Sequence, residues 1–246
     1  MKYFKFILLI SIVLSISYGD KIAVTTKVKG DVELMKIGSK NYLDLNPGTI
    51  LSDGDKIRTG KSGFAAIIFI DDKSILKIKE NSEVVITGQR TAASISKKIN
   101  MDSGTIRATI TKQNSDFVIQ TPTSVASVKG TDFWMITDPI TGDQIIGIEG
   151  IIGLVNIETG QAVDVTEGMT GSSTPDGQTS IEETDPNSIP DDPSDDQEGP
   201  SLIRIYLEGP NGEQKVLIIE YQESILFPLK TNKISLWETL FYGKYS

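Results

Sequence analysis

Residues 47–74 read PGTILSDGDKIRTGKSGFAAIIFIDDKS, and this stretch decides the fold class. Its centre, Phe64–Ile70, is apolar at odd and even positions alike. That pattern is typical of a central β-strand whose two faces are both covered. Turn-forming residues lie on either side, at Asp53–Asp55 and Asp71–Lys73. The stretch therefore predicts short strands joined by tight turns.

Working outward, the period-two pattern extends from Asp20 to about Thr170. Ile106, Ala108 and Ile110 lie on one face, and Arg107 lies on the other. Short apolar runs recur at about 8–12-residue spacing with turn residues between them, which predicts an all-β domain. We expect coiled antiparallel sheets, arranged as a β-roll or a solenoid-like sandwich.

Glycine interrupts the strand pattern in a recurring way. An apolar-x-Gly-x-apolar sequence occurs at Val28–Val32 and at Ile148–Ile152, with a partial copy at Val128–Thr131. Glycine inside a strand pattern indicates a bulge, a corner or a close backbone approach. The copies are unevenly spaced and do not form a repeat, but they suit a sheet that coils sharply.

The amino-acid composition excludes several classes of catalytic and metal-binding site. The 246 residues include no His and no Cys. Disulfides, thiolate zinc sites, cysteine nucleophiles, Ser-His-Asp triads and imidazole bases are therefore excluded. Carboxylate pairs remain open for a glycosidase, but no spacing singles out a pair among Asp132, Asp138, Asp143 and Glu149. We expect no catalytic residues, no cofactor and no metal.

The formal net charge of −9 is concentrated in one segment. Ser172–Pro200 carries nine acidic residues, five of the ten prolines and no Lys or Arg. Low hydrophobicity with charge of one sign predicts a disordered acidic linker over residues 172–200, or less favourably a cation- or partner-binding tract. The rest of the chain is balanced in charge, so nucleic-acid binding is not expected.

Both ends of the chain carry recognisable signals. Residues 1–19 combine Lys2 and Lys5 with a short apolar run and small residues, which predicts a signal peptide cleaved after Ser17 or Gly19. An uncleaved membrane anchor is the alternative. Residues 201–246 predict a β-hairpin followed by a short helix. We thus divide the chain into 1–19, a β-domain at 20–171, the linker, and 201–246.

The stretch Gly48–Gly60 resembles the FecR domain family, whose members share a G-x-x-L-x-x-G-D-x-I-x-T-G core and an F-x-D-G-S turn. Further matches follow in order, at Ser103–Arg107, Thr121–Thr123 and Lys129–Phe133. The resemblance covers roughly Ile22 to Gly171. One departure is Lys73, where the family commonly has Gly.

The residue types of these motifs predict a mainly architectural role, as turn glycines and backbone-bonding side chains. The rival interpretation is a calcium site with Asp53, Asp55, Asp71 and Asp72 as ligands. The motif residues are Gly48, Asp53, Gly54, Asp55, Thr59, Gly60, Gly63, Asp71, Gly104, Thr121, Pro122, Gly130 and Thr131.

For function, the resemblance implies a non-catalytic interaction or sensing role in the cell envelope. We expect a periplasmic or secreted protein that contacts the membrane only through its signal peptide, with an unidentified envelope protein or glycan as its partner. In the family's signalling members, an anti-sigma segment precedes a membrane helix. Only five residues precede the apolar run here, which leaves no room for such a segment. A membrane-anchored FecR-type regulator is therefore only the second choice, and a cell-wall glycan-binding module is a further alternative.

Overall fold

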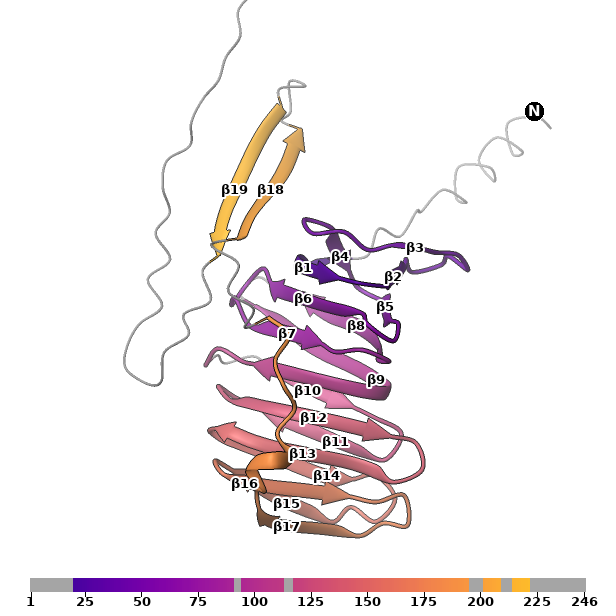
Figure 1. The fold of residues 1–246 in the computed structure, drawn as a ribbon, viewed down its shortest axis with the longest axis vertical. Coiled ribbons are helices and arrows are strands. Elements are labelled where there is room, and N and C mark those ends of the chain that lie inside the picture. Colours follow the sequence, from indigo (N-terminus) through magenta and orange to yellow (C-terminus); the bar gives the residue numbers. More distant parts are fainter. Residues whose placement is uncertain (1–19, 91–93, 113–116, 195–200, 209–213, 222–246) are drawn as a thin grey trace, which may run out of the picture.

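The computed structural model describes residues 20–90, 94–112 and 117–194, and the backbone of residues 201–208 and 214–221. In this part of the chain, seventeen strands build two facing layers that share one long strand, and two further strands form a separate pair. The strands of both layers stack along the long axis of the molecule, with β1 near one end and β17 at the other (Figure 1). The predicted all-β fold is confirmed.

We name the layers sheet A and sheet B. The order in sheet A is β4 (Ile50–Ser52), β1 (Lys21–Lys29), β6 (Phe64–Phe69), β7 (Ile75–Ile78), β9 (Ile95–Thr109), β12 (Asp132–Asp138), β13 (Gly142–Glu149), β16 (Met169–Ser173) and β17 (Thr179–Glu183). The order in sheet B is β3 (Tyr42–Asp44), β2 (Val32–Met35), β5 (Asp55–Thr59), β8 (Glu83–Arg90), β9, β10 (Phe117–Gln120), β11 (Ser124–Val128), β14 (Ile151–Asn156) and β15 (Ala162–Thr166). Neighbouring strands are antiparallel except β9 and β10, which are parallel.

Strand β9 belongs to both layers. Its first half pairs with β8 and β10 in sheet B, and its second half pairs with β7 and β12 in sheet A. Gly104 lies in the second half, near this crossing, with φ at +118°. A Cβ on this residue would lie within 2.5 Å of Ser82, including its Cα. Glycine is therefore required here by both space and backbone conformation.

The recurring glycines turn out to be corners. Gly30, Gly130 and Gly150 each lie between a strand of one sheet and a strand of the other, with φ between +63° and +84°. At Gly30 a Cβ would approach the carbonyl oxygen of Ser62 to 2.2 Å. Of the three arrangements that the sequence pattern leaves open, these glycines adopt the corner, and Gly30 is also a close backbone approach.

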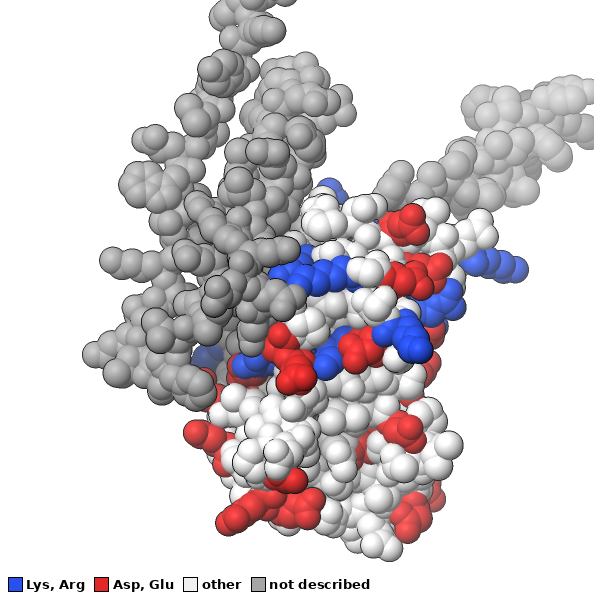
Figure 2. All heavy atoms as spheres, in the orientation of Figure 1, with Lys and Arg blue, Asp and Glu red and all other residues white. Residues whose placement is uncertain are grey.

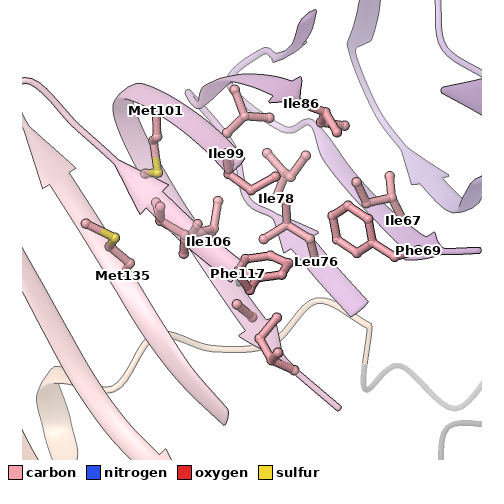
Figure 3. Close-up of a cluster of buried hydrophobic side chains, with 14 of the residues drawn as sticks. Ile67, Phe69, Leu76, Ile78, Ile86, Ile99, Met101, Ile106, Phe117 and Met135 are labelled. Atoms are coloured by element: carbon pink, nitrogen blue, oxygen red, sulfur yellow. The ribbon is translucent and has the colours of Figure 1, made fainter. Parts of the chain in front are cut away.

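The core lies between the two sheets and is one continuous cluster (Figure 3). Phe69 and Phe117 meet edge to face in it, with ring centroids 5.4 Å apart. The predicted central strand Phe64–Ile70 is β6, which lies between β1 and β7. Its Ile68 packs with Val24 and Ile50 in a small second cluster, separate from the main core.

The predicted disordered linker is the main correction. Residues 172–194 are structured: they contain the end of β16, all of β17, and a 3-10 turn at Pro186–Ser188. Residues 184–194, which we call the strap, then run back along sheet A toward β7 (Figure 1). Low hydrophobicity did not produce disorder because charged side chains of sheet A hold the strap, as described below.

After the strap, β18 (Ser201–Glu208) and β19 (Gln214–Tyr221) form the antiparallel pair expected for the C-terminal hairpin. The predicted short helix after it and the predicted signal peptide, residues 1–19, lie outside the described residues. Among the residues that the structure describes, no helix has the length and apolar character needed to cross a membrane.

Candidate functional site

One row of residues crosses the outer face of sheet A, strand by strand and in register. We call it the outer row: Lys27, Ala66, Lys77, Arg107, Trp134, Ile146 and Thr170. Side chains alternate between the faces of a strand. Because Phe133 and Met135 point into the core, Trp134 points away from it.

The strap follows this row from one end to the other. At its start, the Thr184 amide donates to the Gly168 carbonyl, and the Thr184 and Thr170 hydroxyls lie 2.9 Å apart. Near its end, Asp192 contacts β7 and β9. Strands β13 and β12 lie between these points, so the strap must cross them. Trp134 and Ile146 face outward on these two strands and are only 2% and 1% exposed. Lys79 Nζ and Arg107 Cζ lie 5.9 Å and 5.7 Å from the centroid of the Trp134 ring.

The Asp192 carboxylate is the central anchor of the strap. Its Oδ2 accepts from Lys77 Nζ at 2.9 Å and from Arg107 Nη1 at 2.8 Å. Its Oδ1 accepts from the amide and the hydroxyl of Ser194. Asp132 holds Arg107 from the other side through Nε and Nη2. The side chains of Lys77 and Asp192 are 7% and 4% exposed, so this is a buried ion cluster.

Backbone carbonyls of the strap provide the remaining contacts. Lys79 Nζ donates to the Asp191 carbonyl at 2.9 Å, Lys29 Nζ to that of Pro193 at 3.0 Å, and Lys27 Nζ to that of Ser194 at 3.4 Å. We call Lys27, Lys29, Lys77, Lys79 and Arg107 the basic track. It binds the strap through three main-chain oxygens, one carboxylate and one hydroxyl.

Electrostatics keep this cluster charged. Burial by itself raises the pKa of Asp192, but the hydrogen bond from the Ser194 hydroxyl and the contact with Lys77 outweigh it and lower the pKa to about 2. Burial likewise opposes the charge of Arg107, while Asp132 and Asp192 raise its pKa above the usual range. Asp192 and Arg107 therefore both stay charged through the physiological pH range.

Charge is divided along the stack. Residues 20–129 contain seventeen basic and twelve acidic side chains, whereas residues 130–194 contain thirteen acidic ones and no Lys or Arg. On the face in Figure 2, basic side chains gather on the half that carries β1 to β9. The strap thus brings a segment of the acidic half onto the basic half. The β-domain is nearly balanced in total charge, as expected, but the two signs are separated along the stack.

Most of the predicted motif residues lie away from the strap, at turns. Asp55 is fully buried, and it accepts from Lys36 Nζ and from the amides of Ser52 and Ile37. Asp53 accepts from the Gly88 amide. Gly48 and Gly54 have positive φ in the turns that flank β4. These carboxylates bond cations and amides of the fold itself.

The turn around β5 and β6 is equally constrained. The Thr59 hydroxyl donates to the Lys79 carbonyl at 2.5 Å and accepts from the Ser82 amide. Gly60 and Gly63 pack against Asp31, whose carbonyl oxygen would lie 2.2 Å from a Cβ on Gly63. Thr131 was expected to bond the backbone in the same way. Its buried hydroxyl instead has no hydrogen-bond partner in the described part of the chain.

Asp71 and Asp72, which the calcium hypothesis includes, both bind Lys97. Its buried Nζ lies 2.8 Å and 2.7 Å from their Oδ2 atoms. Lys73 follows with φ at +63°, so it adopts the backbone conformation for which the family commonly uses Gly. No group of three or more Asp or Glu side chains able to hold a metal is present among the residues described.

Another buried carboxylate, Asp143, joins β13 to the turn between β10 and β11. It accepts from the hydroxyls of Thr121 and Ser124, next to Pro122. Its Oδ1 has no hydrogen-bond partner within the described structure. Burial raises the pKa of Asp143, and the two hydroxyls only partly offset it. This cluster fixes the turn.

The sequence motifs did not point to the site beneath the strap. Lys77, Lys79, Trp134 and Asp192 stand in none of them, and Arg107 stands in one only as the end of a strand signal. Two signals pointed there nonetheless. Strand parity places Arg107 and Trp134 on the outer face, and basic residues are absent from residues 130–200. Together they indicate an acidic segment available to a basic sheet face.

Comparisons with known proteins bear on the family. The sequence model of the family described as FecR protein matches residues 55–150. Two solved structures of a candidate anti-sigma factor from Parabacteroides distasonis ATCC 8503 are similar, with TM-scores of 0.44 and 0.43 and sequence identities of 10% and 12%. Each similarity covers 53% of this chain and 60% of that chain, less than two thirds of its length. No curated protein matches. The FecR match covers β5 to Gly150, so over this part of the chain the resemblance predicted from the motifs is confirmed.

Proposed function

We propose that this chain is an exported, non-catalytic protein that acts as an interaction or sensing module of the cell envelope. The observation that carries the proposal is the strap: the outer face of sheet A holds an extended polypeptide segment by its main-chain oxygens and one carboxylate. A surface with this chemistry is suited to binding an extended segment of a protein. The FecR match supports a regulatory role.

The alternative in the same family is a membrane-anchored FecR-type signalling regulator, which the FecR match also favours. The two proposals differ in the fate of residues 1–19. A glycan-binding module is less well supported. Sugars commonly stack on exposed aromatic faces, and Trp134 is 2% exposed under the strap.

The mature N-terminus and the location of the protein test the proposal together. The full chain is produced with a C-terminal tag in a bacterial host, the cells are fractionated, and the purified protein is measured by intact mass. An exported protein starts at residue 18 or 20 and is found in the periplasm or medium. An intact Met1 in the membrane fraction favours the anchored regulator, and an intact Met1 in the cytosol contradicts both.

Protein contact is tested in the same cells. A photo-cross-linking amino acid at Lys79, on the basic track, is compared with one at Glu158, an exposed residue of the acidic half. A single cross-linked envelope protein seen only from position 79 supports the interaction role. Equal cross-linking from both positions contradicts a role for this face.

A further inference from the structure

We propose that the basic track is a binding site for an acidic, extended segment of a partner protein, and that the strap occupies this site in cis as a displaceable competitor. The inference rests on the proposed function and deepens it, because it names the site and the chemistry of the partner. It follows from how the strap is held.

The contacts of the strap define what the track recognises. Three bonds go to main-chain carbonyls, which any extended peptide offers. Two contacts depend on sequence: the Asp192 carboxylate between Lys77 and Arg107, and the Ser194 hydroxyl on Lys77 at 2.7 Å. The ligand is therefore an extended segment with an acidic residue followed, two positions later, by a residue with a hydroxyl group.

The strap can leave without breaking the sheet. Residues 189–194 form no strand, and the hydrogen bonds that join Asp191–Ser194 to sheet A all come from Lys or Arg side chains. A partner that supplies the same oxygen atoms restores the same bonds. Release therefore costs side-chain hydrogen bonds and ion pairs, but none of the strand ladder.

The partner must compete with a tethered segment. A tethered competitor acts at an effective concentration of about millimolar for a short connection. The apparent affinity of a second ligand equals its intrinsic affinity multiplied by the fraction of molecules whose site is open. Binding in trans consequently requires either a partner with several acidic residues or a weakened strap, and the second condition can be created by mutation.

The experiment uses a fluorescein-labelled peptide with the sequence of residues 189–200, IPDDPSDDQEGP, and the full chain. In the chain, Asp192→Asn weakens the strap but leaves the track unchanged. We expect the peptide to bind this variant at least tenfold more tightly than the unmodified chain, measured by fluorescence anisotropy. Adding Lys77→Met to the variant should abolish binding, because it removes the cation that contacts both Asp192 and Ser194.

Two peptide controls separate recognition from simple charge attraction. A peptide with the positions of Asp192 and Ser194 replaced by Asn and Ala should bind at least tenfold more weakly. A scrambled peptide of identical composition should also bind weakly. Equal binding of the scrambled peptide, or full competition by millimolar inorganic phosphate, shows a nonspecific anion site and overturns the proposal.

Trp134 reports whether the strap has left. In a Trp237→Phe background it is the only tryptophan, and release should shift its emission to longer wavelength. If the emission is unchanged in Asp192→Asn, the strap is still docked in that variant. The peptide-binding measurements are then repeated with a variant that carries both Asp192→Ala and Ser194→Ala. Emission shifted without peptide binding overturns the site and leaves the proposed function standing. If the peptide binds as expected but the chain is found in the cytosol, the binding site stands and the proposed envelope function is overturned.

Discussion

Lys77 and Asp192 lie 115 residues apart in the sequence, and their charged atoms are 2.9 Å apart in the fold. This ion pair joins a strand in the middle of sheet A to a segment that leaves the far end of the stack. As a result the chain turns back, and the hairpin β18–β19 lies toward the β1 end (Figure 1). The strap thus places the start of the β-domain and the C-terminal hairpin near the same end.

The strap should weaken in acid. The pKa of Asp192 is lowered from 3.8 to about 2, so the unfolded chain binds more protons between these values. The stability that Asp192 contributes is complete above pH 3.8 and is lost as the pH falls through 2. We expect the difference in unfolding free energy between the unmodified chain and Asp192→Asn to disappear over this range in urea titrations. Glu183→Gln, an exposed change of equal charge, should show no such trend.

Asp143 should behave in the opposite way. Burial raises its pKa above 3.8, so the folded chain holds the proton more tightly than the unfolded chain. The wild type therefore loses stability as the pH rises from about 4 through the raised pKa. Relative to it, Asp143→Asn should become more stable with rising pH in the same titrations. If the difference in unfolding free energy between the two proteins stays flat from pH 4 to 7, the raised pKa of Asp143 is contradicted.

The fold should tolerate removal of the Lys97 charge only when the charges of its partners, Asp71 and Asp72, are removed as well. Lys97→Met leaves Asp71 and Asp72 without their buried cation, and breaking a buried ion pair costs about 3–5 kcal/mol. The triple variant with Asp71→Asn and Asp72→Asn should recover most of this loss. Thermal denaturation checks both, with Lys98→Met, an exposed neighbour, as the control. A triple variant no more stable than Lys97→Met is the contrary result.

Gly104 and Gly160 provide a matched test of the crossing strand. Both have positive φ, so alanine is strained at either position by about 1–2 kcal/mol. Only Gly104 also lacks room, because its Cβ would overlap Ser82, whereas nothing lies within 4 Å at Gly160. Gly104→Ala should therefore lower the unfolding free energy at least twice as much. Equal losses in urea titrations indicate that β9 does not pass this close to Ser82.

The sequence predicted much of the fold because its signals are local. Alternation of apolar residues gives the strands, and glycine between apolar residues marks corners such as Gly30 and Gly150. These features depend on a few neighbouring residues. The order of the strands in the sheets, and the sharing of β9 between them, depend on pairings between distant segments and did not follow from the pattern.

The strap was mispredicted for the same reason. Its composition is that of a disordered chain, since Ile189 is the only apolar side chain in it that is larger than proline. Its order comes from Lys77, Arg107 and the lysines of β1, all more than 80 residues away in the sequence. A composition rule that scores each segment alone cannot include bonds of this kind.

A double-mutant cycle between Lys77 and Asp192 tests the docked strap most directly. Lys77→Met, Asp192→Asn and the double variant are unfolded in urea in the Trp237→Phe background, with Trp134 emission as the signal. Residues in direct contact typically couple by about 0.5–3 kcal/mol. We predict a coupling free energy of about 2 kcal/mol, since both side chains are buried. Effects that add within about 0.3 kcal/mol contradict the ion pair and, with it, the docked strap.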